Sequence, residues 1–178
     1  MPRRAPIGAA AALIIAVSGA AAAKEKPPEL VGAPEAKAHV GATDFRVLFW
    51  RVFHASLWSK DGAFDWEQPF ALSLTYARDF TDDQLADRTV EEMSRISGQP
   101  EAALQGFGAE FASCVDDVGP GDRITAISVA ADKARIFQNG QERCTLQRLD
   151  LRRHFFGIWL NRDSSFPEAT TRLIGDGR

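Results

Sequence analysis

One apolar stretch, from Asp44 to Lys60, constrains the fold of this chain more than any other segment. It reads DFRVLFWRVFHASLWSK. Side chains of a β-strand alternate between two faces, and here large apolar residues occupy both sets of alternating positions. The pattern predicts one long strand near the middle of a sheet, covered on both faces. Arg46, Arg51 and His54 interrupt these faces.

These three polar side chains are the first candidates for a functional site. A charge on a buried face needs a partner, water or a ligand. The alternative is that the arginine stems lie along the sheet while their charged ends reach solvent or a carboxylate.

The beginning of the chain has the pattern of a secretory signal. Arg3 and Arg4 precede an alanine-rich apolar run, and Ala21-Ala22-Ala23 before Lys24 supply an A-x-A cleavage site. We therefore expect a signal peptide over residues 1–23, a domain over residues 24–178, and export to the periplasm. A membrane-spanning helix is the less favoured alternative, because the run is short and is followed at once by charge and prolines.

Composition and spacing argue against several classes of function. The chain has 21 Lys and Arg against 24 Asp and Glu, and the basic residues are scattered, so no nucleic-acid surface is expected. The three histidines are far apart in sequence, which argues against a metal site. There is no Gly-rich phosphate loop and no G-x-S-x-G motif, so we expect no cofactor and no serine nucleophile of that type.

Strand patterns dominate the first half of the chain. Residues 24–39 are expected to form a lead-in with a short edge strand at Leu30 and Val31. PFALSLTYAR, residues 69–78, alternates large and small residues and predicts a second strand.

Two helices are predicted next. Thr81 and Gln84 form a capping box for a helix over residues 82–96. Gly98 and Pro100 end that helix, and a second helix is expected after them, because Leu104, Phe107, Phe111 and Cys114 recur at helical spacing. The adjacent pairs Glu91-Glu92 and Asp116-Asp117 are expected to be solvated, because neighbouring helical side chains diverge.

The second half returns to strands and ends in helices. Residues 124–130 predict a strand, and residues 134–149 predict a hairpin around Asn139-Gly140, the dipeptide that a type I′ turn favours. Residues 151–160 have helical periodicity, and Ser165 with Glu168 suggest a capping box for a short terminal helix ending at Leu173. Together these blocks predict an α+β domain with a large antiparallel sheet covered on one face by helices.

The two cysteines, Cys114 and Cys144, leave two possibilities open. In an oxidising compartment they could form a disulfide, but two free buried cysteines are also common. A bridge would stabilise the fold by roughly 3 to 4 kcal/mol in the chain-entropy view.

A polar set on the predicted strands could bind a ligand. It comprises Arg46, Arg51, His54, Tyr76 and Arg78, and Tyr76 is the only tyrosine in the chain. An arginine and a phenol in an apolar cleft would bind a carboxylate or an enolate-like oxygen, because both donate directional hydrogen bonds. The alternative is a buried tyrosine bonded to backbone and an Arg78 that faces water.

Several phrases, in this order and spacing, resemble the bacterial chalcone isomerase-like family. They are RVFHASLWS, PFALSLTYARDFTDDQLADRTVEEMSRISG, DDVGPGDRITAIS, FQNG, FFGIWL and SSFPEATTRLIG. The resemblance covers roughly residues 30–175. It implies an open-faced β-sandwich with a ligand cleft between sheet and helices. It also implies kinship with plant enzymes that close a chalcone to a flavanone and with relatives that bind fatty acids.

The catalytic pattern of the plant enzymes is not matched here. That pattern implies a strand arginine, for which Arg46 or Arg51 could stand, a strand threonine, and a tyrosine and an asparagine near the first helix. Aligning VFHASLWS with the relevant strand places Phe53 at the threonine position, and residues 82–96 contain neither tyrosine nor asparagine. Without those hydroxyl groups, catalysed ring closure is not expected.

The leading hypothesis is an exported domain that binds a small apolar molecule with an anionic or carbonyl end, without established catalysis. The arginines and Tyr76 would hold the polar end, and Phe49, Trp50 and Phe53 would line the apolar part. Two alternatives are an isomerase or intramolecular lyase of the chalcone isomerase type and a structural or partner-binding domain with a filled cleft.

Overall fold

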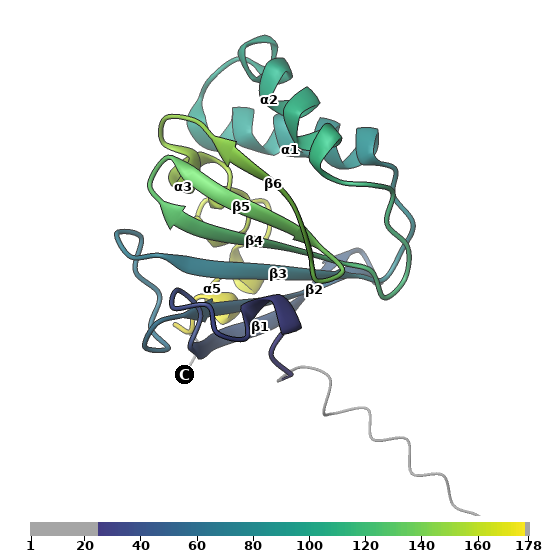
Figure 1. Cartoon of the computed structure of the whole chain (residues 1–178). Helices are drawn as coiled ribbons and strands as arrows, with labels where there is room; N and C mark the ends of the chain where they lie inside the picture. Colours follow the sequence, from purple (N-terminus) through teal and green to yellow (C-terminus); the bar gives the residue numbers. More distant parts are fainter. Residues whose placement is uncertain (1–24, 177–178) are drawn as a thin grey trace, which may run out of the picture.

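Six antiparallel strands form one sheet in which spatial order follows sequence order (Figure 1). The structure is a computed structural model, and it describes residues 25–176. The expected signal peptide, residues 1–23, lies outside the described residues. The strands are β1 (Ala38–Val47), β2 (Trp50–Ser59), β3 (Phe70–Tyr76), β4 (Arg123–Ala130), β5 (Lys133–Gln138) and β6 (Gln141–Gln147).

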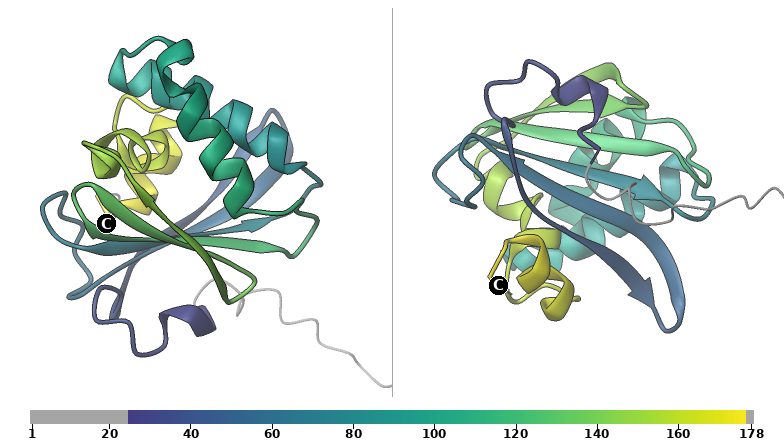
Figure 2. Two further views of the ribbon diagram at one scale, coloured as in Figure 1. Left: turned by 45° about the horizontal axis from the view of Figure 1, so that its top comes forward. Right: turned by 90° about the horizontal axis from the view of Figure 1, so that it is seen from below.

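Helices cover one face of this sheet, as the left view of Figure 2 shows. In the described part of the chain they are α1 (Asp82–Ser97), α2 (Glu101–Cys114), α3 (Leu151–His154), α4 (Gly157–Leu160) and α5 (Pro167–Leu173). The main hydrophobic core lies between these helices and the inner face of the sheet. The predicted α+β fold with an antiparallel sheet is therefore confirmed.

The opposite face of the sheet carries the short 3-10 helix η1 (Pro28–Leu30). Leu30 is fully buried in a small second cluster with Trp58 and Phe137. The expected edge strand at Leu30 and Val31 is therefore wrong, because the Leu30 side chain caps the sheet from outside and its backbone does not join the ladder. Val31 stays exposed.

The stretch from Asp44 to Lys60 is not one central strand, which corrects the main expectation about it. β1 ends at Val47, Leu48 and Phe49 form a two-residue turn, and β2 starts at Trp50. The chain reversal pairs Phe45 with Phe53, so both rings lie on one face and stack at 4.8 Å between centroids. The stretch therefore supplies the hairpin at one edge of the sheet, and strands β3 and β4 are central.

The turn and cap signals around Thr81 and Asn139-Gly140 are confirmed. The Thr81 hydroxyl accepts from the Gln84 amide and the Gln84 side chain accepts from the Thr81 amide, so both halves of the capping box are present. Asn139 and Gly140 have φ values of 50° and 86°, as a type I′ hairpin requires. Local chemistry therefore determines these two boundaries.

Two predictions about the C-terminal segment need correction. Residues 151–160 form two short helices, α3 and α4, instead of one. The capping box expected from Ser165 and Glu168 is absent: α5 has Phe166 at its N-cap with no side-chain cap. Ser165 instead donates to the buried carboxylate of Glu92 at 2.9 Å, and this tertiary partner replaces the local one.

A disulfide joins the helical layer to the far edge of the sheet. Cys114, the last residue of α2, is bonded to Cys144 of β6, with Cα atoms 5.5 Å apart. The sequence left this pairing open. The bond holds the end of α2 against the sheet.

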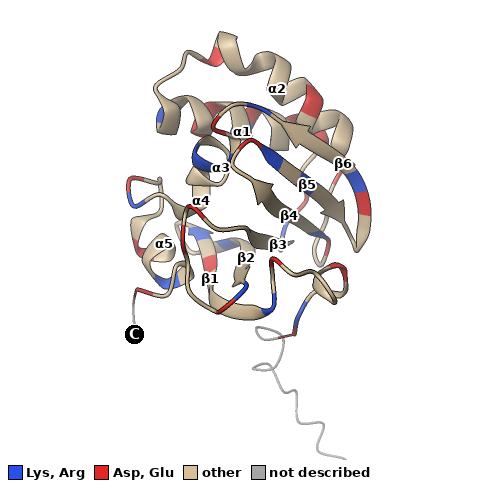
Figure 3. Cartoon of the chain, turned by 60° about the vertical axis from the view of Figure 1, so that its left-hand side comes forward, with Lys and Arg blue, Asp and Glu red and all other residues tan. Residues whose placement is uncertain are grey.

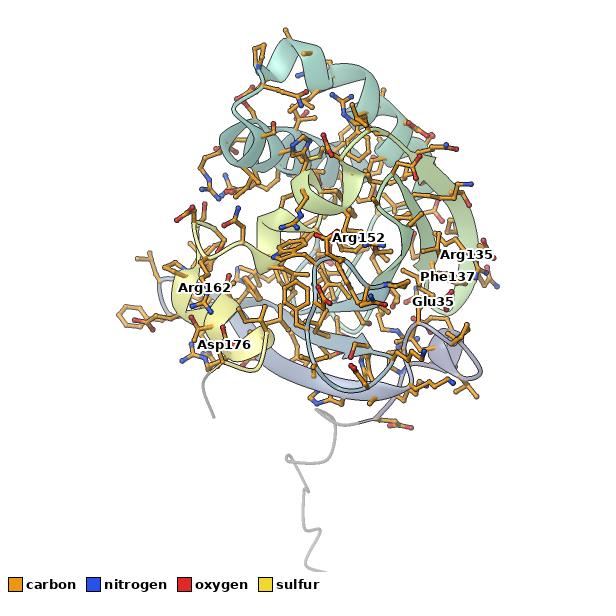
Figure 4. All side chains as sticks on the ribbon, turned by 90° about the vertical axis from the view of Figure 1, so that its left-hand side faces the viewer. Glu35, Arg135, Phe137, Arg152, Arg162 and Asp176 are labelled. Atoms are coloured by element: carbon orange, nitrogen blue, oxygen red, sulfur yellow. A yellow bond between two sulfur atoms is a disulfide. The ribbon has the colours of Figure 1, made fainter. Side chains whose placement is uncertain are left out.

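A buried arginine helps to fix α3 against the sheet. Only 5% of Arg152 is exposed; its Nε donates to the Ser128 hydroxyl at 2.7 Å and its Nη1 donates to the Trp66 carbonyl at 3.0 Å. Burial lowers the pKa of this guanidinium. Figure 4 shows Arg152 near the centre of the molecule, whereas Arg162 and Asp176 lie together near the C-terminal end of the described chain.

Candidate functional site

A mostly apolar cavity of about 660 Å³ lies between the sheet and the helices. Its floor is the inner face of β1 to β4, including Leu72 and Leu74 of β3, and its cover comes from α1, α2 and residues 155–166. Aromatic rings form much of the wall: Phe45, Phe53, Phe80, Phe111, Phe155, Trp159 and Phe166. The volume lies within the range of pockets that hold small molecules.

Polar side chains reach this cavity along one stripe of α1. Gln84, Arg88 and Glu92 recur every four residues and therefore lie on the same side of the helix. Arg88 is the only arginine or lysine of the described chain in the cavity wall. The candidate site residues chosen from the sequence do not include this stripe, because only polar residues on predicted strands were chosen. The spacing of four residues between Gln84, Arg88 and Glu92 could have indicated it.

Arg88 belongs to an ion-pair cluster at the cavity wall. Its Nη1 lies 2.5 Å from a carboxylate oxygen of Glu91, and its Nη2 lies 2.5 Å from one of Glu92. Arg95 and the Ser165 hydroxyl also donate to Glu92, at 2.8 Å and 2.9 Å. The Glu92 side chain is only 6% exposed, whereas Arg88 and Glu91 are 55% and 57% exposed. The expectation that Glu92 is solvated is therefore wrong, because the turn of the helix directs it inward toward three donors.

Tyr76 places a phenol in the wall at the end of β3. Its ring is buried between Phe53 and Phe80, with centroids 5.9 Å and 6.0 Å away. Burial raises the pKa of the hydroxyl, so the phenol stays protonated and can donate a hydrogen bond. Among residues 25–176 the hydroxyl makes no side-chain hydrogen bond, which leaves that donor available to a ligand.

Of the residues singled out from the sequence, Phe53 and Tyr76 line this cavity. Arg46, Arg51, His54, Arg78 and Trp50 lie outside its wall, and Phe49 is 91% exposed. The register of the hairpin explains the difference for three of them: Arg46 pairs with Arg51 and His54 with Asp44, on the face opposite the paired rings of Phe45 and Phe53.

Asp44 on β1 contacts three of the residues that lie outside the cavity wall. Asp44 accepts from Arg46 at 2.9 Å, lies 2.9 Å from the His54 ring nitrogen Nδ1, and lies 3.9 Å from Arg51. Partial burial raises the pKa of Asp44, but the hydrogen bonds with His54 and Arg46 outweigh that effect and lower it below its usual value. Arg78, by contrast, lies over the Trp50 ring at 4.8 Å. This group forms a surface network distinct from the cavity.

Within residues 25–176, no three His, Cys, Asp or Glu side chains are grouped so as to hold a metal ion. None of the helices described in residues 25–176 combines the length and apolar character needed to cross a bilayer.

Fold and cavity together define an open-faced antiparallel sheet with a ligand-sized hollow under its helices. The sequence profile of the chalcone isomerase-like family matches residues 46–166. The protein belongs to the chalcone isomerase-like family, as the sequence phrases predicted; its assignment to a bacterial branch stays a prediction.

A solved structure shares the fold. It is the crystal structure of a fatty-acid binding protein of Arabidopsis thaliana. The two structures have a TM-score of 0.61 and 8% sequence identity, and the match covers 81% of this chain and 90% of that chain. At this identity the similarity establishes the fold alone. A comparison with curated proteins finds no match.

Proposed function

We propose that this protein binds a small apolar molecule with an anionic or carbonyl end, of fatty-acid type, in the cavity between β1 to β4 and α1. The observation that carries this proposal is the aromatic-walled space of about 660 Å³, whose few polar groups lie on α1, at Tyr76 and at Asp79. Such a distribution suits a ligand that is mostly hydrocarbon with one polar end. The structural neighbour named as a fatty-acid binding protein supports the same class.

Arg88 is the side chain best placed to hold a carboxylate head. Its pair with Glu91 is exposed on both sides, and exposed ion pairs contribute only about 0 to 1 kcal/mol. Glu92 keeps Arg95 and Ser165 when Arg88 turns away. A ligand carboxylate can therefore replace Glu91 as a partner of Arg88 at little cost and gain paired hydrogen bonds from the guanidinium.

Tyr76 supplies a second polar position. Its neutral phenol can donate a hydrogen bond to a carbonyl or hydroxyl group of the ligand while Arg88 holds a charged end. Phe53 contributes only a ring at this end of the cavity. The proposal is therefore binding without catalysis, and no turnover of a chalcone is expected.

The test compares ligands with and without a charged head. Palmitate and 1-hexadecanol are titrated against a fluorescent fatty-acid probe, using the parent protein and Arg88→Met. Loss of a hydrogen-bonded charge contact costs about 1.5 to 3 kcal/mol, so palmitate should bind roughly 10 to 150 times more weakly to the variant. The affinity for hexadecanol should stay within about twofold.

Arg135→Met is the matched control for that test. Arg135 also makes an exposed pair, with Glu142 at 2.6 Å, but it lies on β5 beside Phe137 and Glu35, outside the cavity wall (Figure 4). This variant should leave the binding of palmitate unchanged. Equal palmitate affinities for Arg88→Met and the parent would refute the assignment of the head-group site.

A second variant tests the cavity itself. Ala126 of β4 is in the cavity wall, and Ala126→Phe would place a ring in the space assigned to the hydrocarbon chain. Palmitate and hexadecanol should both lose binding while the melting temperature stays near that of the parent. Undiminished binding of both ligands by a folded Ala126→Phe protein would place the ligand elsewhere.

Export is the second part of the proposal. The signal pattern of residues 1–23 supports it, and the Cys114 to Cys144 bond suits an oxidising compartment such as the periplasm. Amino-terminal sequencing of protein purified from its own host should give Lys24 as the first residue. A protein that keeps Met1, or whose cysteines react with alkylating reagent before reduction, would contradict export.

A further inference from the structure

The turn between β1 and β2 exposes an unusual amount of apolar surface. Val47, Leu48, Phe49 and Trp50 are 53%, 85%, 91% and 64% exposed. They are four consecutive residues, and only Val31 and Leu149 elsewhere in the described chain are large apolar residues of comparable exposure. The right view of Figure 2 shows this hairpin projecting at one end of the sheet. A contiguous exposed apolar patch marks an interaction site.

The backbone of this turn is unfavourable for the residues it contains. Leu48 has φ 54°, in the left-handed region, which disfavours a bulky side chain and usually takes Gly, Asn or Asp. In the hairpin between β5 and β6, where φ is positive at both turn residues, the chain has Asn139-Gly140. A leucine with a positive φ and four exposed apolar side chains are both unfavourable at a turn. Their combination at an exposed position indicates that these side chains have a functional role.

Cationic groups surround the apolar tip. Arg46 and Arg51 face each other across the hairpin and are about half exposed, and the Arg78 guanidinium lies over the Trp50 ring. Asp44 and the exposed Asp79 are the carboxylates beside them. Three arginines against two aspartates give this end a positive balance in a chain whose net charge is −3. Figure 3 shows acidic and basic positions interspersed over the face in view.

We propose that the β1 to β2 hairpin tip docks on a lipid bilayer that contains anionic headgroups, with Leu48, Phe49 and Trp50 inserted at the interface. Tryptophan and apolar side chains bordered by arginine are what such an interface selects, and juxtaposed basic residues are attracted to anionic lipids. The four apolar side chains offer on the order of 500 Å². A standard protein interface needs roughly 800 Å² on each partner, so the tip is small for a protein partner.

The position of the tip connects the bilayer to the cavity. Val47 at the end of β1 and Val52 and Phe53 in β2 belong to the cavity wall. An apolar ligand leaving a membrane at the tip would meet the cavity wall a few residues away. This route depends on the proposed ligand, but the docking does not.

Vesicle binding of the processed protein, residues 24–178, tests the docking, because the apolar run of residues 1–23 would itself bind vesicles. The variant carries Leu48→Asn and Phe49→Gly together, which places the residues of the β5 to β6 turn here and puts at position 48 an asparagine that tolerates a positive φ. Co-sedimentation with phosphatidylglycerol and phosphatidylcholine vesicles should fall at least tenfold relative to the parent. The melting temperature should stay equal or rise, and palmitate binding in lipid-free solution should not change, which separates this proposal from the ligand proposal.

Tryptophan quenching locates the contact. Vesicles with brominated phosphatidylcholine should quench the parent protein. Trp50→Phe should remove most of that quenching, because the other tryptophans, Trp58, Trp66 and Trp159, are buried or only partly exposed. Arg51→Gln should weaken binding to anionic vesicles only. Equal vesicle binding by the parent and the double variant would overturn the proposal. So would a dimer in analytical ultracentrifugation that the double variant converts to a monomer, because the occupant would then be a second copy.

Discussion

Two glutamate–arginine ion pairs in this protein differ mainly in how deeply they are buried. Their contributions to the free energy of unfolding can therefore be compared directly. Glu29 in η1 has a fully buried side chain and accepts from Arg123 Nε and Nη2, both at 2.9 Å, and from the Thr125 hydroxyl at 2.5 Å. Glu142 accepts from Arg135 at 2.9 Å and 2.6 Å, but 44% of its side chain is exposed. Both glutamates are therefore bound by two guanidinium nitrogens.

Glu29→Gln should destabilise the protein far more than Glu142→Gln. The substitution keeps the shape of the side chain but removes its charge, and hydrogen bonds to charged groups contribute about 1.5 to 3 kcal/mol. Because Arg123 is 23% exposed and can partly reach water, we expect a loss of about 2 kcal/mol, which lowers the melting temperature by about 4 to 8 °C. The exposed pair should cost less than about 1 kcal/mol.

The difference should also depend on pH in one direction. Burial raises the pKa of Glu29, but hydrogen bonds from Arg123 and Thr125 outweigh this and hold the pKa below its ordinary value of 4.5. A carboxylate whose pKa is lower in the folded than in the unfolded protein stabilises the fold at pH values above its unfolded-state pKa. This stabilisation disappears as the pH falls through its folded-state pKa. Melting curves should therefore separate Glu29→Gln from the parent at pH 7 and converge below about pH 4.5.

Differential scanning calorimetry between pH 3 and pH 7 is the assay. Equal melting shifts for the two substitutions would refute the argument from burial. A gap between Glu29→Gln and the parent that stays constant or widens as the pH falls would refute the pKa argument.

Three further predictions follow from single contacts. Replacing Cys114 and Cys144 by alanine should lower the unfolding free energy in urea by about 3 to 4 kcal/mol, because the bond closes a 30-residue separation. Gly41→Ala should destabilise the fold by about 2 kcal/mol or more, since the added Cβ would lie 2.5 Å from two main-chain carbonyl oxygens of α5; denaturant titration measures this. Tyr76→Phe should weaken the binding of hexadecanol by about 3- to 10-fold and that of palmitate less, measured by probe displacement.

Helix and hairpin boundaries were predictable where a local group determines them. Thr81 and Gln84 begin α1 through a capping box, and Asn139-Gly140 supplies the positive φ values of its turn. The turn at Leu48 and Phe49 was not predictable, because two apolar residues continue the alternation of a strand and carry no turn signal. Missing this turn led to a prediction of one central strand, whereas the structure has a hairpin at the edge of the sheet.

The site was predictable in its apolar part and not in its polar part. Alternation placed Leu72, Leu74 and Tyr76 on one face of β3, and that face lines the cavity. Arg88 reaches the same cavity from a helix that packs over the sheet, and Glu92 is buried only because Arg95 and Ser165 meet it there.

The sequence by itself determined the family, the division of the chain into strand and helix blocks, and the apolar faces that build the core. These depend on periodicity and on contacts between near neighbours. Tertiary structure alone decided which cation faces the cavity, that the cysteines are bonded, and that four apolar residues lie exposed at a hairpin tip. The physical reason is that burial and charge pairing depend on the element packed opposite, and local periodicity contains no record of that element.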